Sequence, residues 1–231
     1  MSRRTNSRIA GFTFLFYIAV AFPGLLLMER ATAGEGTAAK LARLAEHSAD
    51  VRVSILLTLL SCFSAIVLAV TLYAITRDED NELALLVMAC RLAEGVLGAI
   101  GIPTALGLLW LAAAGSGAGT PDAATANAVG AFLLMPAQNA MVGAPFFAVG
   151  SLIFSYLLLR GRIVPVALAW IGVVASVLVV VGAPLQLAGL LKGAILTYMW
   201  LPMLAFEVPL GFWLLIKGAA PPLNRRASTI A

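Results

Sequence analysis

The sequence predicts an all-α polytopic membrane protein, a bundle of six transmembrane helices with two short interfacial helices. Three observations predict this class. Of the 231 residues, 61% are hydrophobic and 11% are charged, whereas soluble domains carry roughly 25% charged residues, so lipid must be the solvent for most of the surface. Six apolar runs reach the roughly 20 residues that a helix needs to cross the bilayer. The basic residues gather at the ends of these runs, as membrane topology requires.

The six expected spans belong to a single membrane domain over residues 1–231. They cover roughly residues 9–28, 53–75, 83–114, 137–159, 163–187 and 194–216. As one straight helix the third would be about 48 Å long, well beyond the hydrocarbon thickness of about 30 Å. We therefore expect it to tilt, to kink at Pro103 or to project beyond the bilayer.

The first span resembles a secretory signal, but we expect it to stay uncleaved. A basic stretch and an apolar run precede Ala31-Thr32-Ala33, which fits a small-x-small cleavage pattern. The apolar run of about 20 residues exceeds the 7 to 15 or so that signal peptides use. Glu29 and Arg30 also intervene before the cleavage pattern. These features favour an uncleaved anchor.

Residues 37–50 are expected to form a helix that lies on the outer membrane face. Two sets of residues alternate there at helical spacing. The polar set is Lys40, Arg43, His47 and Asp50, and the apolar set is Leu41, Leu44, Ala45 and Ala49. Such a two-sided helix is too polar to span the bilayer and suits its surface.

A second outer-face helix is expected over residues 121–134. Thr120 reads as its N-cap, Pro121 as its first-turn proline and Asp122 as an acidic second position. Pro136 is expected to end it. The glycine-rich stretch at residues 115–119 precedes it as a flexible link.

The distribution of Lys and Arg favours cytoplasmic termini. An even number of spans puts both termini on one side, and the side richer in Lys and Arg is the cytoplasm. The terminal side would hold Arg3, Arg4, Arg8, Arg77, Arg160, Arg162, Lys217, Arg225 and Arg226, and the other side Arg30, Lys40, Arg43, Arg52 and Lys192. Nine basic residues against five predict that both termini are cytoplasmic.

Three ionisable side chains fall inside expected spans: Arg91 and Glu94 in the third and Glu207 in the sixth. A charge at membrane depth costs about 2.5 to 3.5 kcal/mol on insertion scales, so such residues pair, face a cavity or act in function. Counted from Asn81 and Lys217, Arg91 and Glu207 both lie about 15 Å deep. We predict that they pair between the third and sixth helices. Glu94, three residues from Arg91, is then the surplus carboxylate of this polar core.

Gly98, Gly101 and Ala105 continue the helix face that carries Arg91 and Glu94, because the successive spacings are three or four residues. Small residues let another helix backbone approach closely. We therefore expect these three residues to form a helix-packing stripe that faces the bundle interior.

Pro202 and Pro209 flank Glu207 in the sixth span. Each proline deprives the carbonyl four residues earlier of its helical donor, here those of Tyr198 and Ala205. We interpret both as kinks of a membrane helix.

The sequence offers few residues that could act in enzyme catalysis. The only histidine lies in the outer loop, so we expect no metal site and no cofactor, and no catalytic residue can be assigned. No nucleic-acid motif accompanies the basic residues, so we expect no nucleic-acid partner.

Three roles remain open for the core of Arg91, Glu94 and Glu207. We favour a non-enzymatic structural or partner-binding role, with the lipid bilayer and a homo-oligomer or membrane partner as the expected partners. The alternative is a transporter, or a protein that binds a small molecule, an ion or a proton through these residues. The second alternative is a lipid-modifying enzyme that uses the two carboxylates.

Several short motifs carry a family resemblance. They are Arg8-Ile9-Ala10-Gly11 in the first span, Arg91-Leu92-Ala93-Glu94 in the third, the stretch from Tyr156 to Pro165, and Glu207 followed by Trp213 to Gly218 in the sixth. In order and spacing they resemble the bacterial membrane family catalogued as domain of unknown function 4386, over nearly the whole chain. The resemblance implies a six-helix protein of the cell (inner) membrane and an uncleaved first span, and it supplies no activity. The wholly apolar stretch Phe146 to Gly150 departs from the more polar fourth span expected of that family.

Overall fold

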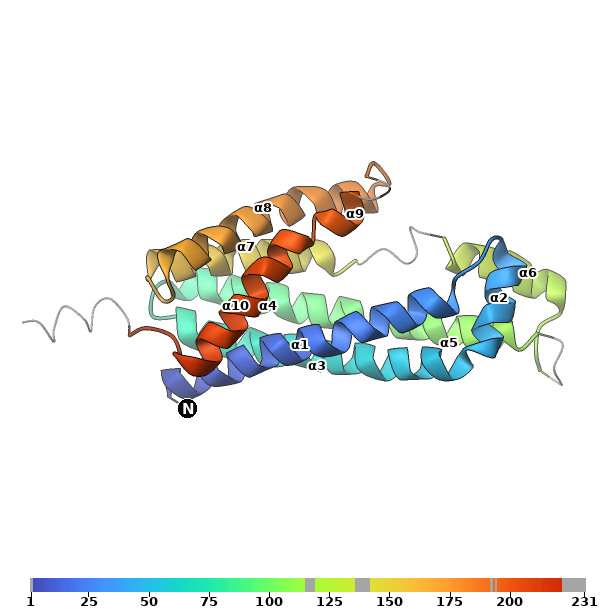
Figure 1. Cartoon of the computed structure of the whole chain (residues 1–231), viewed down its shortest axis with the longest axis horizontal. Coiled ribbons are helices and arrows are strands. Elements are labelled where there is room, and N and C mark those ends of the chain that lie inside the picture. The colour runs from blue at the N-terminus through green and yellow to red at the C-terminus, as the bar shows by residue number, and fades with distance from the viewer. Residues whose placement is uncertain (1, 115–118, 136–141, 192, 194, 222–231) are drawn as a thin grey trace, which may run out of the picture. The chain divides into compact units, whose positions relative to one another are not determined.

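The computed structural model describes residues 2–114, 119–135, 142–191, 193 and 195–221. In this part of the chain every regular element is an α-helix, which confirms the all-α class. The helices are α1 (Arg3–Ala31), α2 (Thr37–Glu46), α3 (Ser48–Thr76), α4 (Asn81–Gly98), α5 (Gly101–Ala112), α6 (Ala123–Leu133), α7 (Ala144–Arg160), α8 (Val166–Leu187), α9 (Ile195–Tyr198) and α10 (Leu201–Ile216), as Figure 1 shows.

Four stretches are long and apolar enough to cross a membrane: α1, α3, residues Asn81–Ala112 and α8. Helices α6, α7 and α10 are apolar but shorter. Helix α1 begins before and ends after the residues expected of the first span, and α3 likewise contains the expected second span. The lengths thus support a membrane protein with several spans.

The chain forms two compact units. The first unit holds Met1–Tyr17, Phe63–Leu97 and Val142–Ala231, and the second holds Ile18–Cys62 and Gly98–Met141. Helices α1 and α3 each have one end in the first unit and the other end in the second unit. The single membrane domain expected over residues 1–231 stays a prediction.

The core of the first unit is apolar, and so is much of its outer surface. The core draws on α1, α3, α4, α7, α8 and α10, with Phe14, Leu72, Val87, Phe154, Val179 and Phe206 among its members. Leu86, Val174 and Phe212, on three of the same helices, are exposed. Helices that are apolar on every side are typical of membrane proteins, in which the outer faces lie against lipid.

Helices α1 and α10 approach each other at two glycines. A Cβ atom added to Gly11 would collide with the backbone nitrogen of Leu215 and would lie 2.5 Å from the carbonyl oxygen of Gly211. A Cβ atom added to Gly211 would lie 2.9 Å from Cγ of Leu15. Only glycine leaves room for backbones this close, so these two positions fix how α10 packs on α1.

The outer helix expected over residues 37–50 is shorter in the structure. Helix α2 ends at Glu46, where the backbone N–H of His47 donates to the carbonyl of Arg43, and α3 already begins at Ser48. Asp50 therefore belongs to the first turn of α3, where an acidic side chain is favourable. The prediction was wrong there because helical spacing runs on across the corner between the two helices.

The apolar side of α2 faces protein within the second unit. Leu41 and Leu44 are buried in a cluster with Leu108, Leu111 and Ala126 of α5 and α6. The side of α2 that the sequence suggested would rest on lipid is thus buried against neighbouring helices.

Helix α6 begins later than expected, and its cap is a different residue. The side chain of Asp122 accepts a hydrogen bond of 2.8 Å from the backbone N–H of Thr125, so Asp122 is the N-cap in place of Thr120. This N–H, with the Thr125 hydroxyl, holds the pKa of the Asp122 carboxyl below its usual value. The expected link at residues 115–118 and the expected stop at Pro136 lie outside the described residues.

Proline breaks the third expected span one turn before Pro103. Pro103 has no N–H for the carbonyl of Ala99, and its ring crowds that carbonyl. Instead, Ile102 donates its N–H to Ala99 over 3.1 Å, and the helix divides into α4 and α5 between Gly98 and Gly101. The kink expected at the proline is thus a break upstream of it.

The sixth expected span is also divided, which corrects the continuous helix expected over residues 194–216. Helix α9 ends at Tyr198 and α10 begins at Leu201. Pro202 cannot donate to the carbonyl of Tyr198, so the helix stops there and restarts with proline in its first turn. In the fourth span the described helix begins at Ala144, and residues 137–141 of the expected span lie outside the described residues.

Candidate functional site

Arg91 of α4 lies at the centre of a buried polar cluster in the first unit. Its side chain is 1% exposed. Its Nη1 donates to Oε2 of Glu94 at 3.0 Å, and its Nη2 donates to Oγ of Ser151 at 3.1 Å and to Oε1 of Glu207 at 3.4 Å. One guanidinium therefore joins α4, α7 and α10, as its fork of donors allows.

Two aromatic rings complete the surroundings of Arg91. The guanidinium carbon lies 5.6 Å from the ring centroid of Phe14 on α1 and 4.7 Å from that of Phe147 on α7. Both distances suit cation–π attraction, which is stronger where water is excluded. The rings thus stabilise the cation.

Glu94 uses both carboxylate oxygens. Oε2 accepts from Arg91, and Oε1 accepts from the hydroxyl of Tyr17 on α1 at 3.0 Å. Its side chain is 8% exposed. The carboxylate is therefore satisfied on both sides, and Tyr17 brings a fourth helix into the cluster.

Glu207 of α10 is held more weakly. Its side chain is also 8% exposed, and within the described residues its hydrogen bond comes from Arg91 over 3.4 Å. A charged N–H to carboxylate bond is typically about 2.7 to 2.9 Å long. The expectation that Glu94 is the surplus carboxylate is therefore wrong, because Tyr17 and Arg91 both serve Glu94 and leave Glu207 with one long bond.

The structure brings Arg91, Glu94 and Glu207 together, but it leaves the expected packing stripe outside the cluster. Gly98 and Gly101 are exposed, and a Cβ atom at Gly101 would meet nothing within 4 Å. Ala105 packs against the core of the second unit. The stripe was inferred from one continuous helix face, and the break after Gly98 removes that continuity.

Sequence reasoning missed Tyr17 and Ser151, although a signal for both was present. At about 1.5 Å per residue, Tyr17 lies about 21 Å along its helix from Arg3, and Glu94 lies about 20 Å from Asn81. Ser151 lies about 14 Å from Arg160, level with Arg91. The depth comparison that paired Arg91 with Glu207 also places Tyr17 and Ser151 level with the charged residues, although it does not single them out among the other polar uncharged side chains.

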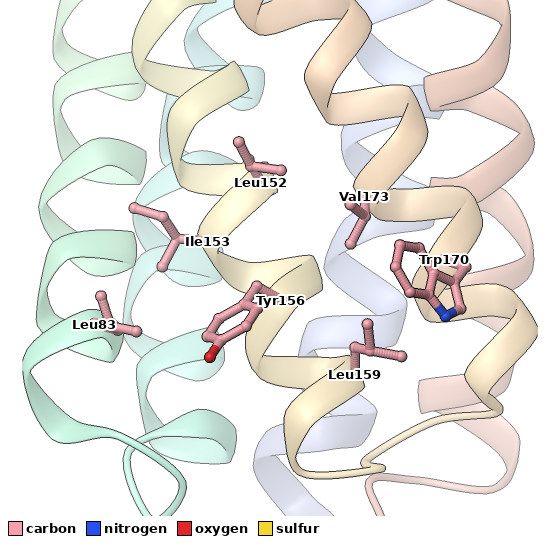
Figure 2. Close-up of a pocket in the computed structure, with 7 residues that line it drawn as sticks. All are labelled: Leu83, Leu152, Ile153, Tyr156, Leu159, Trp170 and Val173. Atoms are coloured by element: carbon pink, nitrogen blue, oxygen red, sulfur yellow. The ribbon is translucent and has the colours of Figure 1, made fainter.

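A separate groove lies between α4, α7 and α8 in the first unit. It has a volume of about 410 Å³ and is lined by Leu83, Leu152, Ile153, Tyr156, Leu159, Trp170 and Val173, which Figure 2 shows. Tyr156 and Trp170 are the two lining residues whose side chains carry a polar atom, and the surface of the groove is almost wholly apolar. Neither carboxylate of the cluster lines it, so it offers the cluster no substrate pocket.

A comparison with protein families shows which family the chain belongs to. The family described as Domain of unknown function (DUF4386) matches residues 9–218. The chain belongs to this family. The matched range holds the whole cluster, from Phe14 on α1 to Glu207 on α10. No curated protein and no solved structure matches the chain.

The structure gives the motifs of this DUF4386 protein a physical meaning. Gly11 lies in the motif of the first span, and it packs on Leu215 in the motif of the sixth. The motif of the third span begins with the cation, Arg91, and ends with Glu94, the carboxylate that forms the shorter hydrogen bond to Arg91. The motifs therefore coincide with the contacts that join α1, α4 and α10.

Proposed function

We propose that this DUF4386 protein is a six-span membrane protein with a non-enzymatic role, in which the cluster acts as an ionic clamp between helices. The observation that carries the proposal is the position of Arg91. It is 1% exposed, and its terminal nitrogens bond to groups on three helices. Removing the partner of a buried charge is strongly destabilising, so such a centre fixes the register of the helices it joins.

The geometry favours a clamp over a lipid-modifying enzyme. A catalytic carboxylate must reach substrate or water. Both oxygens of Glu94 are occupied by protein donors, and both carboxylate side chains are 8% exposed. The partners that fit a clamp are the lipid bilayer and a second copy or another membrane protein against the exposed apolar faces.

Polar contacts at one end of the first unit support an even number of spans, and one of them, from the backbone N–H of Ala219 to the hydroxyl of Ser7, joins the end of α10 to the start of α1. Arg3 near the N-terminus pairs with Asp78 at 3.1 Å, and Arg160 at the end of α7 pairs with Asp80 at 3.0 Å. These ion pairs connect the start of α1 and the end of α7 to the segment between α3 and α4, and all three were expected on the cytoplasmic side. We propose six spans, formed by α1, α3, α4 with α5, α7, α8, and α9 with α10, in the cell (inner) membrane with both termini cytoplasmic.

Replacement of Arg91 tests the clamp. We expect Arg91→Met to lower the free energy of unfolding by about 3 to 5 kcal/mol, because it leaves a buried carboxylate without its cation. Denaturant unfolding of the full chain in lipid nanodiscs measures this loss. Arg52→Met, which removes an exposed arginine of α3, is the control and should change it by no more than about 0.5 kcal/mol. Equal stabilities of the two variants would rule out the clamp.

A second candidate is a transporter or a protein that binds a small ligand, an ion or a proton. One observation favours it, namely that two carboxylates share one guanidinium. Flux measured in proteoliposomes, abolished by Glu207→Gln without unfolding, would support it. Absence of flux for protons and small ions in the wild type would refute the transport role.

A further inference from the structure

The charges of the cluster do not balance if both carboxylates are ionised. Arg91 carries one positive charge, and Glu94 and Glu207 would carry two negative charges. The charged and titratable groups near Glu207 are Arg91 and Glu94 of α4 and, beyond Glu94, Tyr17 of α1. None of these supplies a second cation. A net negative charge in an apolar interior is costly, and neutralisation by a proton is the usual outcome.

The hydrogen bonds show which carboxylate has room for that proton. Both oxygens of Glu94 accept, one from the Tyr17 hydroxyl and one from the Arg91 guanidinium, each at 3.0 Å. A proton on either oxygen would face a donor. Glu207 accepts through Oε1 over 3.4 Å, and within the described residues no donor is directed at its Oε2. A weak bond of this length suits the carbonyl oxygen of a neutral acid.

We propose that the cluster is a proton-binding site that holds one proton, on Oε2 of Glu207. Arg91 and Glu94 then form the ion pair, and Glu207 is a neutral carboxylic acid that accepts a hydrogen bond from Arg91. The whole cluster is neutral. This inference rests on the proposed clamp for its location and adds the ligand that the clamp requires, which is a proton.

The proton is open to direct observation in the wild-type chain. Infrared spectroscopy of the full chain in lipid at neutral pH should show the carbonyl stretch of a protonated carboxylic acid, shifted by exchange into heavy water. Glu207→Gln should remove this band. Glu79→Gln is the control, because the Glu79 side chain is only 7% exposed and lies 3.6 Å from Arg3, outside the cluster, and the band should survive it. Absence of the band in the wild type, or its persistence in Glu207→Gln, would overturn the proposal.

A stability comparison separates this proposal from the clamp. Glutamine has the shape and charge of a protonated glutamate, so Glu207→Gln should melt within experimental error of the wild type, whereas Glu94→Gln should melt at a lower temperature. Equal destabilisation by the two variants would overturn the proton site and leave the clamp standing. A harmless Arg91→Met would overturn the clamp itself, whatever the infrared spectrum shows.

Discussion

At the scale of single residues, the cluster shows how a cation is accommodated among apolar helices. Arg91 has two carboxylates, a serine hydroxyl and two aromatic rings around it. Each removes part of the cost of burying a charge. The buried ionisable residues could be predicted from the sequence, because lipid penalises charge at any depth. Their uncharged partners could not be predicted from charge alone, since tyrosine and serine are common in membrane helices.

The hydroxyl of Tyr17 makes a specific contribution that can be measured. We expect Tyr17→Phe to lower the free energy of unfolding by about 1.5 to 3 kcal/mol, because it removes a hydrogen bond to a charged group and leaves one oxygen of Glu94 without a donor. Denaturant unfolding in nanodiscs gives this value. Tyr156→Phe, which alters a half-exposed tyrosine of the apolar groove, should be close to neutral. A similar loss of unfolding free energy in both variants would mean that the hydrogen bond from Tyr17 to Glu94 adds no stability of its own.

At the scale of helices, proline indicated where helices break, whereas helical periodicity did not show where one helix ends and the next begins. Proline marked both breaks, but each break lies before the proline, where a carbonyl loses its donor. The corner between α2 and α3 was missed, because helical periodicity continues through His47. Close helix approach at Gly11 was also missed, since it depends on a partner more than 190 residues away in the chain.

The approach of α1 to α10 can be tested with one methyl group. Gly11→Ala should destabilise the protein by about 1 to 3 kcal/mol or more, because the new Cβ atom meets backbone atoms that cannot move aside. Gly101→Ala is the matched control in an open helical position, and it should be neutral or stabilising by up to about 1 kcal/mol. Thermal unfolding of both variants measures the contrast. If Gly11→Ala is as well tolerated as Gly101→Ala, the two helices do not pack in this way.

At the scale of the whole molecule, composition was sufficient to predict an all-α chain with several helices long and apolar enough to cross a membrane. Apolar cores together with apolar exposed faces fit a helical membrane protein, and the family match confirms the resemblance seen in the short motifs. The division into two compact units could not be predicted, because it arises from which distant segments contact one another. The weak bond of Glu207 is likewise a property of tertiary geometry.

The number of spans and their orientation can be tested by labelling single cysteines. In a chain with Cys62 and Cys90 replaced by alanine, Glu35→Cys should react with an impermeant maleimide in intact cells. Arg160→Cys and Glu82→Cys should react only after permeabilisation, because six spans put both positions in the cytoplasm. If α7 does not span, Arg160→Cys will react in intact cells. That result would contradict the six-span topology.

Arg91 and Glu94 form the ion pair at the centre of the proposed clamp, and a double-mutant cycle measures the coupling between them. Unfolding free energies of the wild type, Arg91→Met, Glu94→Gln and the double variant are measured in nanodiscs. We predict a coupling of about 1 to 3 kcal/mol, with the double variant losing less than the sum of the single losses, because removing the carboxylate relieves the charge that Arg91→Met leaves unpaired. Losses that add to within about 0.5 kcal/mol would contradict the ion pair on which the clamp rests.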